Sequence, residues 1–466
     1  MLMSAAFLAS ALIQFALGLV VAWVLGAAEF GAYALALAAA VLVQTIVFEW
    51  IRLSATRFHH GEDGNRLAGL LMRYFTRITA GLLVVALLLL VFGEVRRWLL
   101  CVIPLVAVAA GFVDFRAALL RAEFNQRGYA LLMLLRNLLA IILLPLAAWH
   151  FGSAEAVLAA FLLALVVSAA AIEFAFRRRG SLASPDAQPM ADLRALLRYS
   201  GPIVATNCVY LALFFALRSA VALTGGMAAA GQFSLAFDFV TKLFTTIGTA
   251  IDLALFQLAV RAARDEGDGA GKARVAVNAE IVAAILLPMA VGLFLVVSLL
   301  EEFLVAPAFR GPFSTFVMAA VPGIALYALI QYALHPFLQI VHRTMPLVHA
   351  AMAGFVVAGL LALAMPIFGL ALVPAIFWGL AGAMLAAMLV LIRHIGRAAL
   401  PSPGFAGRLM LALAGMIGVV LVIRPLGQGP GVLTAAITGG AATFAAVALL
   451  VDLAGLRTWL RARKAA

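Results

Sequence analysis

Residues 21–36 read VAWVLGAAEFGAYALA, and residues 221–236 read VALTGGMAAAGQFSLA. The two stretches are identical at seven of sixteen positions without a gap, where an Ala/Leu-rich chain gives roughly two identities by chance. Both stretches lie where one apolar segment ends and the next begins. Because six apolar segments separate them, an even number, the second stretch enters the membrane in the same direction as the first. The chain is therefore predicted to be a duplication with parallel repeats, an arrangement known in transporters.

The composition places the whole chain in a membrane. Hydrophobic residues make up 66% of the 466 residues and charged residues 11%, which is more apolar sequence than a soluble core requires. One crossing takes about 20 apolar residues, and the chain has fourteen candidate segments. We predict an all-α polytopic membrane protein with about 14 transmembrane helices. These helices are expected to form two six-helix pseudo-symmetric lobes followed by two C-terminal helices.

Lys and Arg residues are unevenly divided between the two sets of loops. With the N-terminus inside, the inner loops and the C-terminal tail hold 25 of the 32 basic residues, and the outer loops hold only Arg96, Arg97, Arg310 and Arg424. This bias predicts that both termini are cytoplasmic. It also accounts for the net charge of +12, because basic loops lie beside an anionic leaflet. The charge therefore gives no reason to expect nucleic acid as a partner.

The longest hydrophilic interval on the cytoplasmic side is 177–200, where three arginines precede Gly, Ser and Pro residues. Such a composition is typical of a linker, so we place the lobe boundary there. The predicted domains are an N-lobe at 1–176, this cytoplasmic linker, a C-lobe at 201–392, and two further segments with a basic tail at 393–466. The outer loops are all short, which argues against an enzyme with an outer catalytic domain.

The segment 231–257 carries a polar stripe. At 100° per residue, six of its polar side chains fall on one face, within about 100° of one another: Asp238, Thr241, Lys242, Thr245, Thr249 and Asp252. Charges survive within a membrane where they face a bundle interior or water. The stripe is therefore predicted to line a cavity, with Asp238 and Asp252 as coupling residues and Lys242 as a substrate-binding residue. The alternative is that Asp238 and Lys242, four residues apart, form a buried pair that only joins helices.

A shift of 200 residues places an equivalent polar face in the first half of the chain. The matching positions are Thr45, Glu49 and Arg52, which also lie within about 60° of one another. Two such faces, related by a pseudo-two-fold axis, would look at each other across a central cavity. We therefore assign Arg52 to substrate binding and Glu49 to coupling. A pair whose side chains reach the inner membrane surface is the alternative.

The segment 201–223 presents Asn207, Tyr210 and Arg218 on one face. Arg offers a planar fork that matches phosphate oxygens, so these three residues are predicted to bind substrate. The alternative is that the Arg218 guanidinium reaches the outer membrane surface. Gln14, in the first apolar segment, is a further candidate for the same cavity.

Two histidine patterns resemble chemical sites. His59 and His60 precede two acidic residues, but no further ligand lies at a useful spacing, so we predict a solvated loop and no metal site. His335, His342 and His349 recur every seven residues and are interpreted as helix-end residues in preference to a proton relay. No cofactor is expected apart from a possible coupling ion, H⁺ or Na⁺, and no ATP-binding loop or catalytic triad is present in the sequence.

The stretch LGAAEFGAYALA at 25–36 resembles the LG-x-x-E-[YF]-G-x-Y-x-x-A motif of Wzx-type polysaccharide flippases. These belong to the multidrug/oligosaccharidyl-lipid/polysaccharide export superfamily. GQFSLA at 231–236 is similar to that family's G-x-[YF]-x-x-A, and LRA at 120–122 and QIVHR at 339–343 are similar to its loops after the fourth and tenth segments. One departure is Leu217, which precedes Arg218 in the segment 201–223. The family often has an acidic residue directly before this basic residue.

The resemblance implies a flippase, not an enzyme, that works by alternating access in the bacterial inner membrane. It would carry undecaprenyl-pyrophosphate-linked oligosaccharide to the outer leaflet for lipopolysaccharide or exopolysaccharide biosynthesis. Its partners would be this lipid-linked oligosaccharide, membrane lipids and other membrane proteins of polysaccharide assembly. The alternatives are a cation-coupled multidrug exporter of the same superfamily and a membrane enzyme or scaffold of polysaccharide assembly.

Overall fold

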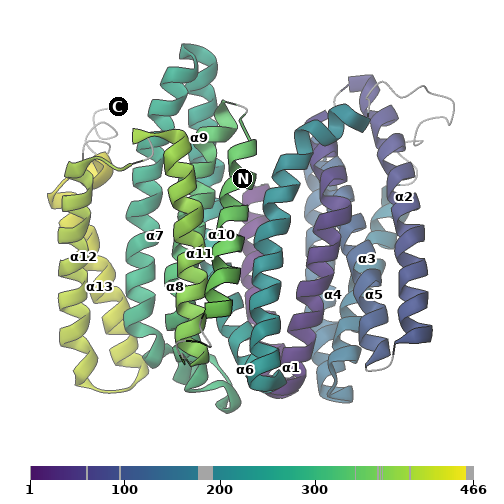
Figure 1. Cartoon of the computed structure of the whole chain (residues 1–466), viewed down its shortest axis with the longest axis horizontal. Coiled ribbons are helices and arrows are strands. Elements are labelled where there is room, and N and C mark those ends of the chain that lie inside the picture. The colour runs from purple at the N-terminus through teal and green to yellow at the C-terminus, as the bar shows by residue number, and fades with distance from the viewer. Residues whose placement is uncertain are drawn as a thin grey trace. The chain divides into compact units, whose positions relative to one another are not determined.

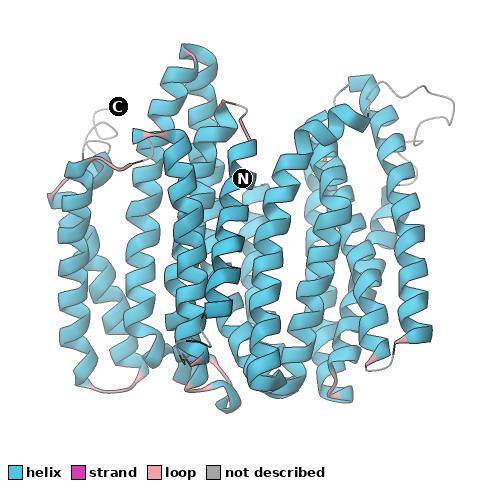
Figure 2. Ribbon diagram, in the orientation of Figure 1, coloured by secondary structure: helices cyan, strands magenta, loops and turns pink. Residues whose placement is uncertain are grey.

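The computed structural model describes residues 2–58, 61–93, 96–176, 193–341, 343–364, 367, 369, 371–397 and 400–457. Every regular element in these ranges is a helix (Figure 2). The α-helices are α1 (Leu2–Phe58), α2 (Gly61–Phe92), α3 (Arg97–Ala122), α4 (Gln126–Phe151), α5 (Ala154–Phe176), α6 (Leu193–Glu266), α7 (Asp268–Leu304), α8 (Pro312–Leu329), α9 (His335–Ile340), α10 (Met345–Ala364), α11 (Leu372–Ile395), α12 (Pro403–Ile423) and α13 (Pro430–Leu450). A π-helical turn, η2 (Ile330–Leu334), joins α8 to α9.

Twelve helices within these ranges are long and apolar enough to cross a membrane. Two of them have apolar spans of 45 and 67 residues, much more than the about 20 residues of one crossing. These two are α1 and α6, and each contains one residue with non-helical backbone angles. The predicted all-α membrane fold is confirmed. The count of fourteen crossings stays a prediction. It would hold if α1 and α6 each cross the membrane twice, once on either side of the break.

The two breaks are at Gly26 (φ 73°, ψ 173°) and Gly226 (φ 80°, ψ 175°). This combination of angles is accessible essentially only to Gly. The two glycines occupy matching positions of the stretches 21–36 and 221–236, so the repeat in the sequence is also a repeat in the backbone. At each break one apolar helix ends and the next begins, as the sequence predicts.

The chain divides into two compact units, Met1–Leu235 and Ala236–Ala466, here called the first and the second unit. The first unit thus extends beyond the predicted linker at 177–200. Residues 177–192 of that linker lie outside the described part of the chain, and the predicted domain boundaries stay predictions.

A direct backbone contact joins the two copies of the repeat within the first unit. A Cβ atom on Gly31 would lie 2.1 Å from the carbonyl oxygen of Met227, and one on Gly231 would lie 1.9 Å from that of Ala27. Real Cβ atoms do not approach other atoms so closely. The two copies of the repeat therefore pack on each other through bare backbone at Gly31 and Gly231.

The core of the first unit lies between the second half of α1, α2 and α3. The rings of Phe48 and Phe75 are stacked with centroids 4.4 Å apart, and the Phe115 ring lies 6.2 Å from that of Phe75. Ile51 and Leu71 are fully buried beside them. Buried aromatic rings remove a large apolar area from contact with solvent, so these three elements hold each other firmly. The helices α4 and α5 pack on each other and on α1 and α3.

In the second unit, the C-terminal pair α12 and α13 packs on α7 (Figure 1, yellow and teal). Buried side chains of α12 form this contact: Phe405, Leu409, Leu413 and Met416. Two hydrogen bonds fasten the pair near both ends of α12. The Ser402 backbone N–H donates to Glu280 over 2.9 Å, and Arg424 donates to Ser298 over 3.0 Å.

Candidate functional site

Three helices of the first unit bring polar side chains together within membrane-crossing segments. Gln44 on α1 donates from Nε2 to Oδ2 of Asp114 on α3 over 2.6 Å. Arg136 on α4 lies with one guanidinium nitrogen 3.6 Å from Oδ1 of the same carboxylate. The Arg136 side chain is 19% exposed. Since charges within a membrane are paired or face water, this cluster is a candidate for a polar lining of the transport path.

Gln14 contacts α4 at Asn137, and its predicted place in the cavity stays a prediction. Its Nε2 donates to Oδ1 of Asn137 over 3.4 Å, a long and therefore weak hydrogen bond. Asn137 is buried and follows Arg136 directly on α4. The contact brings the first half of α1 to the polar face of α4.

Glu49 and Arg52 bind each other on α1. Arg52 Nε donates to one carboxylate oxygen of Glu49 over 2.8 Å, and a second guanidinium nitrogen contacts the other oxygen. This is the two-pronged geometry that makes Arg–carboxylate pairs strong. The Glu49 side chain is 11% exposed and that of Arg52 is 30% exposed. The prediction that they share a face is confirmed, while their assignment to coupling and substrate binding stays a prediction.

Arg218, Tyr210 and Asn207 lie on the part of α6 that belongs to the first unit. Arg218 is 9% exposed and Tyr210 is 1% exposed, while Asn207 is half-buried. A guanidinium that reached the membrane surface would leave its side chain largely uncovered by protein. The burial of Arg218 therefore favours a place in the interior, and its role in binding substrate stays a prediction.

The polar stripe of α6 meets the π-helical turn within the second unit. Tyr332, in η2, donates from its hydroxyl to the carbonyl oxygen of Thr245 over 3.2 Å and lies 3.0 Å from the hydroxyl of Thr249. Gly248 leaves room for the ring, since a Cβ there would lie 2.2 Å from it. Single π turns within α-helices are frequent at functional sites. The middle of the stripe thus packs against Tyr332.

The charged members of the stripe are Asp238, Lys242 and Asp252, and all three are half-buried. Their predicted roles in coupling and binding remain predictions. His335 opens α9 and is buried, and His349 is exposed on α10. The other histidines named above, at 59, 60 and 342, lie outside the described residues.

The sequence reasoning missed Asp114, Arg136 and Tyr332. Arg136 lies within an apolar segment and could have been selected on that ground, because buried charges in a membrane are costly. Asp114 lies at the end of another apolar segment, where a charged residue is common and does not by itself indicate a functional site. Tyr332 had no signal, because the π turn that presents it leaves no mark on the spacing of apolar residues.

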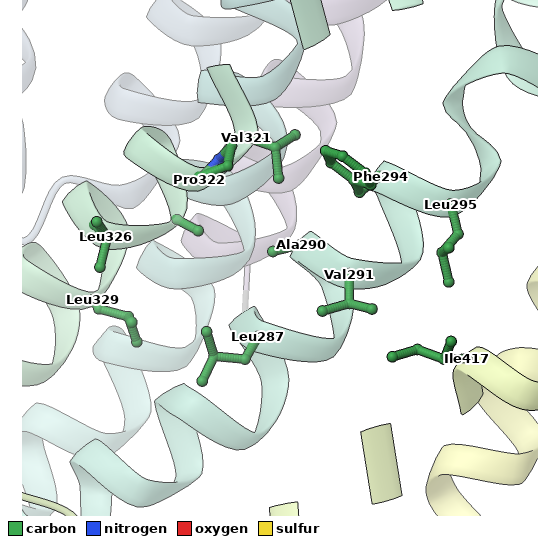
Figure 3. Close-up of a pocket in the computed structure, with 11 residues that line it drawn as sticks. Leu287, Ala290, Val291, Phe294, Leu295, Val321, Pro322, Leu326, Leu329 and Ile417 are labelled. Atoms are coloured by element: carbon green, nitrogen blue, oxygen red, sulfur yellow. The ribbon is translucent and has the colours of Figure 1, made fainter. Parts of the chain in front are cut away.

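An apolar groove lies within the second unit, between α7, α8 and α12 (Figure 3). Its volume is about 560 Å³, in the range of small-ligand sites. Figure 3 shows side chains of α7 and α8 facing one another, with Ile417 of α12 at one end. The lining residues are Leu287, Ala290, Val291, Phe294, Leu295, Val321, Pro322, Ala325, Leu326, Leu329 and Ile417. None of them carries a polar side chain, so the groove suits a hydrocarbon chain.

In a comparison with protein families, residues 1–256 match the family described as "Polysaccharide biosynthesis protein". This match covers more than half of the chain. A search of curated protein sequences gives no match.

Solved structures give matches over most of the chain. The chain is similar to the lipid II flippase MurJ in an inward closed conformation, with a TM-score of 0.73, 12% identity and coverage of 96% of this chain and 98% of that one. It is also similar to a MATE transporter in a straight conformation, with a TM-score of 0.59, 18% identity and coverage of 85% and 94%. A MOP superfamily transporter from Pyrococcus furiosus matches with a TM-score of 0.59, 16% identity and the same coverage. These likenesses establish the fold.

Proposed function

The chain belongs to the polysaccharide biosynthesis protein family, and we propose that it is a flippase for undecaprenyl-pyrophosphate-linked oligosaccharides. It would carry them by alternating access to the outer leaflet of the bacterial inner membrane, for lipopolysaccharide or exopolysaccharide biosynthesis. The fold shared with a lipid II flippase supports a lipid-linked substrate. Its membrane partners would be lipids and other proteins of polysaccharide assembly.

The observation that carries this proposal is the groove between α7, α8 and α12. A polyprenyl chain is hydrocarbon throughout, and a groove without polar side chains accepts it without stripping water from any polar group. The anionic head of the same molecule requires a different surface. In the first unit, the buried guanidinium of Arg218 and the half-buried one of Arg136 offer planar donors that match pyrophosphate oxygens.

A cation-coupled multidrug exporter is the second candidate, because MATE transporters share the fold. The family match favours the flippase, because residues 1–256 match a family described as a polysaccharide biosynthesis protein.

Reconstitution tests the proposal. Purified protein is placed in liposomes with a fluorescent undecaprenyl-pyrophosphate disaccharide, and translocation is measured with a membrane-impermeant quencher. We expect the labelled lipid to equilibrate between leaflets only when the protein is present. Transport of a cationic dye under an ion gradient, without movement of the labelled lipid, would select the exporter.

Groove-filling variants test the part of the proposal that concerns the lipid chain. Ala290→Trp and Ala325→Trp each narrow the groove, and Leu411→Trp on an exposed part of α12 is the matched control. We expect each of these two variants to remove lipid contacts equivalent to about two methylene groups. This loss should slow transport of the long-chain lipid roughly tenfold. A short-chain analogue should be affected much less. Equal slowing for both chain lengths would contradict a lipid site in the groove.

Arg218 tests the head-group part of the proposal. Arg218→Gln removes the fork and should abolish translocation at unchanged membrane abundance, while Arg218→Lys should restore only part of it, because Lys is a point charge without the fork. Full activity in Arg218→Gln would remove Arg218 from the proposed binding surface.

Coupling to H⁺ or Na⁺ is proposed to use Asp238 and Asp252, with Glu49 as the counterpart in the first unit. Asp238→Asn should uncouple or abolish transport in folded protein. The decisive comparison is the double variant Asp238→Leu/Lys242→Met, which removes both charges together and so leaves no unpaired one. If this double variant transports normally, Asp238 and Lys242 have only a structural role.

The proposed orientation places both termini in the cytoplasm. Reporter fusions after Ser184 and after Lys464 should both give a cytoplasmic signal, and one at Gln428 an outer signal. This expectation rests on the excess of basic residues in the loops assigned to the inside. Opposite signals at Ser184 and Lys464 would require an odd number of crossings between them.

A further inference from the structure

Three of the loops assigned to the outside meet at one carboxylate of the first unit. Glu29 follows the Gly26 break in α1, and its Oε1 lies 2.5 Å from a terminal guanidinium nitrogen of Arg96. Its Oε2 accepts a hydrogen bond from the backbone N–H of Ala154 over 2.9 Å. Arg96 Nε also lies 3.2 Å from a carboxylate oxygen of Glu155. One side chain of α1 thus joins the residue before α3 to the start of α5.

The geometry of this cluster distinguishes it from an ordinary surface ion pair, which contributes little to stability. Ala154 is the first residue of α5, where the backbone N–H has no acceptor within its own helix. A carboxylate at that end also interacts favourably with the helix dipole. Arg96 has a left-handed φ of 47°, which few residues other than Gly adopt. Its guanidinium is held between two carboxylates, so both partners of Glu29 are fixed in position.

Glu29 lies two residues before the contact between the two copies of the repeat. A Cβ on Gly31 would lie 2.8 Å from the backbone nitrogen of Gly231, and a Cβ on Gly231 would lie 2.9 Å from that of Gly31. The two distances are nearly equal, so each glycine faces the other in the same way. A contact made of backbone alone has no side chain that could adjust to a shift. Its geometry therefore depends on the direction in which the chain leaves the Gly26 break.

We propose that Glu29 is the positioning residue that sets this direction and holds Gly31 against Gly231. It does so by making residues 27–31 move together with α3 and α5. The second copy has Ala229 at the matching position, and a methyl group can form none of these bonds. The first copy is then the fixed side of the contact, and the second copy packs against it. The link to transport rests on the proposed function, because a transporter must open and close this end; the contact itself does not depend on a substrate.

Hydrogen exchange of the purified full-length protein in nanodiscs tests this role. The variants are Glu29→Gln and Arg96→Gln, and Arg97→Gln is the matched control, since it removes a charge from the same end and leaves the contacts of Glu29 intact. We expect exchange in residues 26–34 and 152–157 to rise about five- to tenfold in both variants, because local opening becomes easier. Exchange in residues 226–235 should rise by a similar factor. The control should exchange at the wild-type rate in all three regions.

The response of residues 226–235 separates positioning from local support. Faster exchange in 26–34 and 152–157 alone would mean that Glu29 only supports the loops that it contacts directly, and would overturn the proposal. So would wild-type exchange in Arg96→Gln, which lies outside any helix and provides the test should Glu29→Gln fail to accumulate. The double variant should match the stronger single variant, because both remove the same bond. Because no substrate is present, the result of this experiment does not depend on the result of the flippase assay.

Discussion

The two copies of the repeat, residues 21–36 and 221–236, have the same backbone break but different side-chain contacts. Gly26 and Gly226 break their helices with angles that differ by only a few degrees. Three residues after the first break stands Glu29, which is bound to Arg96 and to the start of α5, whereas the second copy has Ala229. Both copies therefore have the same turn, and the residue that anchors it in the first copy is replaced by Ala in the second.

The helices that follow the breaks differ in the same way. In the first copy, Glu49 and Arg52 form a charged pair on α1. In the second copy, Thr249 takes the place of Glu49 and lies against Tyr332 through neutral groups. Matching positions of the two copies thus carry chemically different polar groups.

The largest effect should come from the contact between the copies. Gly31→Ala and Gly231→Ala each place a methyl carbon about 2 Å from a carbonyl oxygen, and neither backbone can move away without separating the helices. We expect each to destabilise the protein by about 3 kcal/mol or more, seen as a lower midpoint of thermal unfolding. Gly201→Ala, which meets nothing within 4 Å, is the control. Clearly unequal losses of stability in the two variants would contradict a contact in which each glycine faces the other in the same way.

A smaller and equal effect is expected at the two breaks. Gly26→Ala and Gly226→Ala introduce no clash, since nothing lies within 4 Å of either Cβ. Their cost is the backbone strain of the angles alone, about 1–3 kcal/mol each. The same unfolding measurement should give losses that agree within about 0.5 kcal/mol. If only one variant is destabilised, the other break is not required by the fold.

Much of this fold was readable from the sequence for a specific reason. The positions of Gly26 and Gly226 are marked twice, once by their matching neighbours and once by the apolar segments on either side. The contact of Gly31 with Gly231 was not readable. A small residue shows that something approaches closely, but the partner depends on how two distant segments cross, and no local pattern records that.

The candidate site divides along the same line. The shared face of Glu49 and Arg52 follows from helical spacing within one segment, and the structure confirms it. The cluster of Gln44, Asp114 and Arg136 joins three segments, each with a single polar group, so helical spacing could not bring them together. Tyr332 depends on a π turn, which shifts the helix face by an amount that the residue sequence does not show.

The charged pair of the first copy should matter more than the neutral contact of the second. Glu49→Gln leaves the Arg52 guanidinium without its carboxylate in a half-buried position, and we expect a loss of about 1–2 kcal/mol, below the range for fully buried pairs. The double variant Glu49→Gln/Arg52→Gln should recover part of this loss, because no charge is left unpaired. Thermal unfolding of the three variants provides the measurement. A double variant less stable than Glu49→Gln would contradict this account.

The smallest effect is expected for the neutral contact between Tyr332 and α6. Tyr332→Phe removes the hydroxyl that donates to Thr245 and meets Thr249. The Thr249 hydroxyl can then turn back to a carbonyl of its own helix, as Thr245 already does toward Thr241. No buried polar group is left without a partner, so the loss should be about 0.5–1.5 kcal/mol, the net value of an ordinary hydrogen bond.

Thr249→Val tests the same contact from the other side. It keeps the shape of the side chain and leaves the Tyr332 hydroxyl bonded to the Thr245 carbonyl, so its cost should be smaller than that of Tyr332→Phe. The double variant should lose less than the two single losses combined, because both remove one shared bond. If Tyr332→Phe proved more destabilising than Glu49→Gln, the neutral contact would be the stronger of the two. The polar contacts of the second copy, and not those of the first, would then contribute more to the stability of the protein.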